Sequence, residues 1–186
     1  MNGVSRGKLA ILSMFALGCL LGGFAVWHHY RQGRRVLAAW GPDVATLVRH
    51  ASRVEVWRLG PSGGRDAPRL QVGDQPRDVL ERVEISRLPG LVHARHALII
   101  DRNYDWLTKP SAQAARWNLA LHFRDGDDVA TLVFATQSRL AYVAGNRQPI
   151  CTTAMLDRVV EFVSPHLSGR IEDSSGTGGE LSPAGG

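Results

Sequence analysis

Residues 117–135 read WNLALHFRDGDDVATLVFA and decide the fold of the globular part. Apolar and polar residues alternate from Trp117 to Arg124, which is the period expected of a strand with one buried face. The run VATLVFA is apolar on both faces, as is typical of an inner strand. The DGDD group between them resembles the start of a calcium loop, but no Glu closes an EF-hand there. We therefore interpret it as a hairpin turn.

The sequence on either side of this hairpin predicts further elements. The expected strands are 53–59, 83–87, 140–143 and a short one after the Gly145-Asn146 turn. The expected helices are 44–50 with Asp43 as cap, 89–101, and a last one after Thr152 or Thr153 as cap. This order predicts an α+β domain, a small and mainly antiparallel sheet packed with about two helices. The expected core contains Trp117, Phe123, Leu132, Phe134, Val159 and Phe162.

The apolar run Leu9–Trp27 reads LAILSMFALGCLLGGFAVW and contains no charged residue. Its length as a helix is about 28 Å, close to the roughly 30 Å hydrocarbon core of a bilayer, whereas the core of a signal peptide needs only about 7–15 residues. Basic residues flank the run on both sides, and Trp27 and Tyr30 suit a membrane interface. The run predicts a single transmembrane helix, a signal-anchor with membrane lipid as its partner.

Two other fates of this segment stay open. Residues 23–25 (GFA) have the small-x-small form that signal peptidase accepts, and Cys19 is a candidate for lipidation. Ala16 is a poor residue upstream of a lipidated cysteine, and the length favours a retained anchor. Three positive groups lie on each side of the run, so charge alone does not orient it. A short tail is easily retained inside, so we expect an inner-membrane protein of a bacterial cell envelope with its domain outside the cytoplasm.

Composition divides the chain into segments. We expect a short basic tail at 1–8, the anchor at 9–27, a juxtamembrane segment at 28–41 and a single domain at 42–168. A long exposed loop is expected at 60–78, which is rich in Gly, Pro, Arg and Asp. The Gly/Ser-rich residues 169–186 are expected to form a disordered tail.

The net charge of +5 lies entirely in residues 1–35, which hold five basic and no acidic residues. The remaining 17 basic and 17 acidic residues cancel. A basic flank of a membrane segment attracts anionic head groups. The sequence of the domain contains no cluster of basic residues that would predict a basic face. We therefore expect no nucleic-acid partner.

The candidate metal ligands are three histidines. His93 and His96 are three residues apart on an expected helix, so one metal ion can reach both imidazoles. His122, Asp101 or Cys151 would have to complete the set through the fold. The alternative is that His93 and His96 lie on the solvated side of an amphipathic helix, which we favour. No metal ligand is therefore assigned, and no cofactor is expected.

Two further residue types were weighed for catalysis. Asp101 and Asp105 are candidate paired carboxylates, although local turn hydrogen bonds are the interpretation that we favour for Asp105. Cys151 is expected to be a small buried residue and not a catalytic thiol. The sequence contains no GxSxG, GxxxxGK[ST], HExxH or CxxC signature. It indicates a non-catalytic binding or accessory module at the membrane. The alternative is a membrane-tethered enzyme or metal-binding domain that uses His93 and His96 with a nearby carboxylate or His122.

Overall fold

The computed structural model describes residues 6–31, 34–63, 67–110, 115–146, 148–169 and 171. Its helices are α1 (Arg6–Arg31), α2 (Arg34–Trp40), α3 (Pro42–His50), α4 (Leu91–Leu98) and α5 (Met155–Val163), with short 3-10 turns η1 (Asp101–Asn103) and η3 (Ser164–His166). Its strands are β1 (Arg53–Pro61), β2 (Arg69–Val72), β3 (Gln75–Glu84), β4 (Tyr104–Asp105), β5 (Leu119–Asp125), β6 (Asp128–Ala135), β7 (Leu140–Val143) and β8 (Ile150–Thr152).

The strands form one eight-stranded sheet in the order β2-β3-β1-β5-β6-β7-β8-β4, and every pairing described is antiparallel. The expected central hairpin is confirmed, because Asp125 pairs with Asp128 across the turn between β5 and β6. Gly126 in this turn has a φ of 59°, a conformation that glycine adopts without steric cost. The predicted α+β class is thus confirmed, with a larger sheet than expected.

Both faces of the sheet are buried. The main core lies between one face and the helices, and Val54, Phe123 and Phe134 are fully buried in it. A second core on the other face includes Trp57 and Trp117. The strand predicted at 53–59 is confirmed and contributes to both cores. Trp117 belongs to a second core that the sequence did not predict. Phe162 is only partly buried against the main core.

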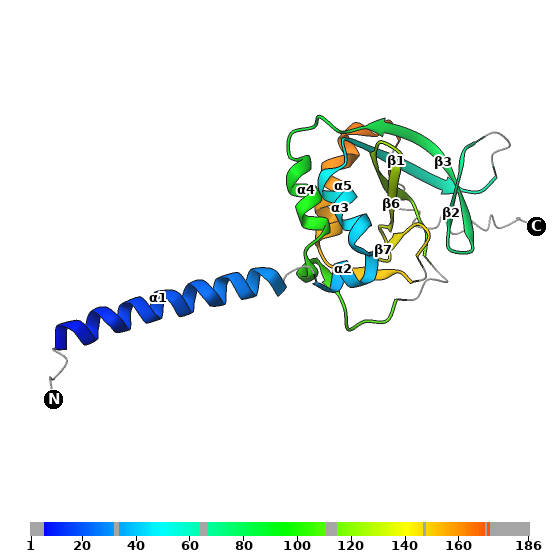
Figure 1. The fold of residues 1–186 in the computed structure, drawn as a ribbon. Coiled ribbons are helices and arrows are strands. Elements are labelled where there is room, and N and C mark those ends of the chain that lie inside the picture. Colours follow the sequence, from blue (N-terminus) through cyan, green and yellow to red (C-terminus); the bar gives the residue numbers. More distant parts are fainter. Residues whose placement is uncertain are drawn as a thin grey trace, which may run out of the picture.

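Helices α2 to α5 cover one face of the sheet, and α1 projects away from them (Figure 1). The folded part begins earlier than residue 42, because Val36 and Trp40 of α2 lie in the main core. Trp40 packs edge-on against Tyr104, with ring centroids 5.4 Å apart. The segment interpreted as juxtamembrane therefore contributes to the domain.

The predicted loop at 60–78 is mostly wrong. β1 continues to Pro61, and β2 and β3 form a hairpin that turns at Gly73, whose φ is 58°. Val72 and Val79 anchor this hairpin in the second core. The sequence misled because only Val72, Asp78 and Val79 are buried in these two strands, so few apolar residues mark them in the sequence.

Several helix boundaries also differ from the predictions. Asp43 does not cap α3, since the N-cap position is Gly41 and Asp43 lies in the first turn after Pro42. Neither threonine caps α5, because Thr152 and Thr153 donate their hydroxyl protons to carbonyl oxygens of other segments. The helix expected at 89–101 is shorter, spanning Leu91–Leu98. Of the strand expected at 83–87, only Val83 and Glu84 lie in a strand, at the end of β3.

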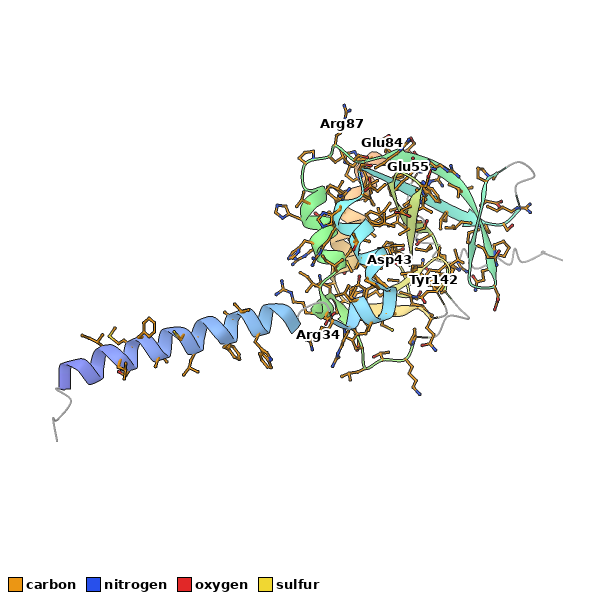
Figure 2. The ribbon with its side chains drawn as sticks, in the orientation of Figure 1. Arg34, Asp43, Glu55, Glu84, Arg87 and Tyr142 are labelled. Carbon is orange, nitrogen blue, oxygen red and sulfur yellow. The ribbon has the colours of Figure 1, made fainter. Side chains whose placement is uncertain are left out.

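The apolar run predicted as an anchor is helical, because α1 includes all of it. Its described side chains are exposed and project from several sides of the helix, which extends away from the domain (Figure 2). Over the part of the chain that the structure describes, no helix combines the length and the hydropathy required of a membrane-crossing segment. The transmembrane assignment at 9–27 is therefore not supported by the structure. Residues 1–5 of the basic tail and residues 170 and 172–186 of the expected disordered tail lie outside the described residues.

Candidate functional site

The structure does not gather the candidate metal ligands. His93 and His96 are both exposed on α4, whereas His122 lies on β5. Among the residues that the structure describes, no three His, Cys, Asp or Glu side chains are placed to hold a metal ion. No observation therefore favours the alternative of a metal-binding domain.

His122 has a structural environment on the sheet. Its ring stacks on that of Trp57, with centroids 4.4 Å apart and planes 18° from parallel. Its Nδ1 lies 2.8 Å from the hydroxyl of Thr131 on the neighbouring strand. Arg82 from the strand on the other side of β1 lies over the Trp57 ring at 4.6 Å. Burial lowers the pKa of His122, against the attraction of Glu55, so the neutral imidazole is favoured.

Asp101 and Asp105 each bind separate backbone groups. Asp101 accepts hydrogen bonds from the N–H groups of Arg35 and Val36 at 3.1 and 2.9 Å. Asp105 accepts the hydroxyl proton of Thr108 at 2.6 Å and the backbone N–H groups of Leu107 and Thr108. These bonds lower the pKa of Asp105, and the bond from the Thr108 hydroxyl has the largest effect. The predicted local turn hydrogen bonds of Asp105 are confirmed. They do not favour acid-base work by the two carboxylates.

Cys151 is half-buried on β8, less deeply than we expected. Burial, and next to it the negative charge of Asp105, raise the pKa of its thiol. A raised pKa disfavours the thiolate, which is the nucleophilic form. This environment fits a packing residue. Cys19 is exposed on α1.

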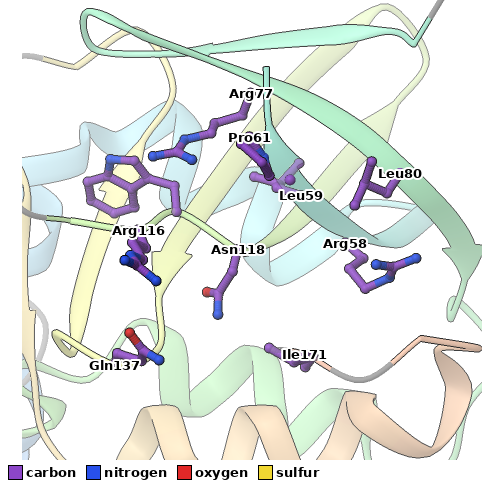
Figure 3. Close-up of a pocket in the computed structure, with 11 residues that line it drawn as sticks. Arg58, Leu59, Pro61, Arg77, Leu80, Arg116, Asn118, Gln137 and Ile171 are labelled. Carbon is purple, nitrogen blue, oxygen red and sulfur yellow. The ribbon is translucent and has the colours of Figure 1, made fainter. Parts of the chain in front are cut away.

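A cleft of about 390 Å³ opens beside β1 and the segment before β5. Three arginines from three segments line it: Arg58 on β1, Arg77 on β3, and Arg116 before β5 (Figure 3). Their neighbours in the lining include Asn118 and Gln137, and its described members include no carboxylate. We call this site the arginine cleft.

Burial and the positive charge in the arginine cleft both act on the pKa of Arg77. Partial burial lowers the pKa of the Arg77 guanidinium, and the nearby charge of Arg116 lowers it further. Arginine stays protonated at neutral pH in spite of such shifts. The cleft therefore holds like charges in a partly desolvated place, where electrostatic interactions are stronger than in bulk water.

Sequence reasoning missed the arginine cleft because its residues are far apart along the chain and follow no local pattern. Arg77 even lay inside the stretch that was interpreted as an exposed loop. The position of Arg77 opposite Pro61 depends on the register of β1 and β3, which includes a shift after Arg58. The approach of Arg77 to Arg58 and Arg116 can be recognised only once that register is known.

Comparisons of this chain with models of protein families, with curated proteins and with solved structures find no match.

Proposed function

We propose that α1 holds this chain at a lipid bilayer and that the α+β domain is a non-catalytic binding module. The observation that carries the proposal is the concentration of exposed apolar side chains on α1. Ten of the fifteen large apolar side chains that are exposed in the described residues belong to it: Ile11, Leu12, Met14, Phe15, Leu17, Leu20, Leu21, Phe24, Val26 and Trp27. Exposed apolar surface of this extent marks an interaction site.

The distribution of these side chains supports lipid as the partner. They surround α1 and do not form one stripe, and a helix that is apolar all round is typical of burial in a core or a membrane. Each large apolar side chain that leaves water contributes about 1.5–3 kcal/mol. The described side chains from Ile11 to Trp27 cover roughly 26 Å of helix, and the apolar Leu9 and Ala10 extend the sequence run towards the roughly 30 Å of a bilayer core.

The binding role of the domain is supported by its site residues. Asp101, Asp105 and His122 have structural partners, whereas the arginine cleft and the outer edge of β2 are accessible surfaces. An edge strand presents unpaired backbone groups with which an extended segment of a partner can pair. A protein partner at this edge is part of the proposal.

Extraction of membranes at alkaline pH tests the anchor. Full-length chain is expected in the membrane pellet, whereas Leu17→Lys combined with Leu20→Lys is expected in the aqueous fraction. Each charge near the centre of a membrane helix costs about 2.5–3.5 kcal/mol. Leu107→Lys is the matched control, because Leu107 is 93% exposed on the domain and its substitution should leave the pellet unchanged.

Recovery of the unmodified full-length chain from the aqueous fraction, with its amino-terminal residues intact, would refute the anchor. The proposed orientation places the domain outside the cytoplasm as a single-pass protein. Protease added to spheroplasts with an intact inner membrane should then digest the domain, and protection of the domain would reverse the orientation.

A further inference from the structure

We propose that the arginine cleft binds the oxyanion group of a small organic anion, with an apolar part of the ligand against the wall of the cleft. The proposal names a ligand class for the binding module and rests on the function proposed for the domain. It does not require α1. The cleft volume of about 390 Å³ lies within the range of small-ligand sites.

Arg77 is held in place by neutral acceptors. Its Nη2 donates to Oε1 of Gln75 at 2.7 Å and to the carbonyl oxygen of Ala115 at 3.5 Å. A guanidinium has five N–H donors, and the bonds described use one nitrogen only. Its Nε is buried without an acceptor among the described residues. Arg77 is thus fixed in position, while its charge meets no carboxylate in the described part of the chain.

Arg58 differs from Arg77 because its charge is already matched. Its Nε lies 3.2 Å from Oε2 of Glu81. Glu81 in turn accepts the backbone N–H of Ser168 at 2.7 Å, so this ion pair belongs to the packing of the domain. An incoming anion is therefore expected to bind Arg77, in the field of Arg116, and not Arg58.

Arg116 adds positive charge beside Arg77. Burial is the larger cause of the lowered pKa of Arg77, and the charge of Arg116 lowers it further, because the two guanidinium groups repel each other. An oxyanion between them replaces this repulsion by charge-assisted hydrogen bonds, and the planar guanidinium binds carboxylate and phosphate with two parallel bonds.

The wall of the arginine cleft selects against a bare ion. Leu59, Leu80, Trp117 and Ile171 supply apolar surface next to the arginines. Asn118 is positioned by two hydrogen bonds with Thr136, one donated by its side-chain amide at 2.6 Å and one accepted by it at 3.1 Å. Figure 3 shows Asn118 between Arg58 and Arg116, with Leu80 and Ile171 on the same side as Arg58. An oxyanion attached to an apolar group matches this arrangement better than an inorganic anion.

Calorimetric titration of the full-length chain in a neutral detergent tests the proposal. The probes are N-acetyl-leucine, which carries a carboxylate beside an apolar side chain, and N-acetyl-leucinamide, which has the same shape without the charge. We expect saturable binding of the carboxylate only, weakened by added salt because the interaction is electrostatic. Inorganic phosphate should bind more weakly than N-acetyl-leucine. Equal binding of both acetyl-leucine probes, or of neither, would refute the proposal.

Variants separate the site from general charge. Arg77→Gln and Arg116→Gln should each raise the dissociation constant about tenfold or more, the factor expected when one hydrogen bond to a charged group is lost. Arg124→Gln removes an exposed arginine of the central hairpin and is the matched control, with no change expected. A folded Arg116→Gln variant with unchanged affinity, or a loss of affinity in Arg124→Gln equal to that in Arg77→Gln, would refute the assignment.

One further arm identifies the source of the anion. Micelles doped with phosphatidylglycerol should not displace N-acetyl-leucine if the ligand is a soluble organic anion. Displacement that disappears in Arg77→Gln would assign the lipid phosphate as the oxyanion and overturn the soluble source. Membrane extraction of Arg77→Gln should match that of the unmodified chain, so failure of the cleft is distinguishable from failure of the anchor.

Discussion

At the scale of single residues, Asp101 joins two segments that are 65 positions apart in the sequence. Its carboxylate oxygens accept the backbone N–H groups of Arg35 and Val36 in the first turn of α2. The first N–H groups of a helix have no acceptor within the helix, so a carboxylate placed there stabilises it. Asp101 therefore acts as a helix cap supplied from outside, and it holds α2 beside the η1 turn.

Replacing Asp101 by alanine should lower the free energy of unfolding by about 1–2 kcal/mol, because two backbone donors lose their acceptor. Asp101→Asn retains one acceptor oxygen and should cost less. Asp43→Ala is the control, since Asp43 lies in the first turn of α3 and makes no capping bond there; about 0.5 kcal/mol or less is expected. Urea denaturation of the full chain measures all three. An Asp43→Ala variant as unstable as Asp101→Ala would contradict the assignment of the cap.

At the scale of elements, Glu81 connects β3 with the residues that follow η3. Its carboxylate accepts the N–H groups of Ser168 at 2.7 Å and Gly169 at 3.4 Å, and it pairs with Arg58 on β1. The backbone N–H of Ser168 has the largest effect on the pKa of Glu81, and hydrogen bonds from the Ser168 side chain, Arg58 and Gly169 add to it. Together they lower this pKa from 4.5 to about 2, although burial acts in the opposite direction. The end of the described chain is thus attached to the sheet by an ionised side chain.

This attachment should depend on pH in a defined window. A carboxylate whose pKa is lowered by folding stabilises the folded state fully above its ordinary value of 4.5, and the contribution is lost as the pH falls towards about 2. Glu81→Gln should therefore be less stable than the unmodified chain at pH 7, and the difference should shrink between pH 4.5 and 2. Unfolding measured across this window checks the prediction.

Glu161→Gln serves as the control for Glu81, because Glu161 is an exposed carboxylate on α5. Its stability relative to the unmodified chain should stay nearly constant over the same window. A pH-independent difference for Glu81→Gln would show that the carboxylate acts by its shape and not by its charge.

At the scale of the whole molecule, the two cores share the same strands. In β6, Leu132 points into the main core and Val133 into the second; in β7, Ala141 and Leu140 divide in the same way. Because each strand contributes to both cores, loss of one core removes the support of the other. We therefore expect the domain to unfold as one cooperative unit.

Leu132→Ala and Leu140→Ala test this cooperativity with the same chemical change on opposite faces. Each leucine is nearly or fully buried, so each substitution should cost about 2–5 kcal/mol. Tryptophan fluorescence and far-ultraviolet circular dichroism should report coincident transitions in both variants. Leu107→Ala, at an exposed position, should change stability by about 0.5 kcal/mol or less. Two separate transitions in Leu140→Ala would show that the second core is an independent unit.

Local patterns accounted for the parts of this chain in which each residue's role depends on its neighbours. The alternation at 53–59, the hairpin at 117–135 and the helical apolar run at 9–27 are recovered in the structure. Periodicity predicts such elements because one face of a strand or helix must be buried. The β2–β3 hairpin was missed because few apolar residues anchor it. The threonine caps were wrong because both hydroxyls donate to carbonyl oxygens of distant segments, and the Asp43 cap was wrong because Asp43 lies in the first turn of α3 after Pro42.

The sequence by itself determined the α+β class, the central hairpin, and the concentration of charge-free apolar residues near the amino end. Only the tertiary structure decided that α2 belongs to the core, that both faces of the sheet are buried, and that Arg58, Arg77 and Arg116 line one cleft. The physical reason is that backbone propensity and burial periodicity act over only a few residues, so they predict elements but not contacts between distant segments. The meeting of three arginines depends on strand register and on packing between segments up to 58 positions apart.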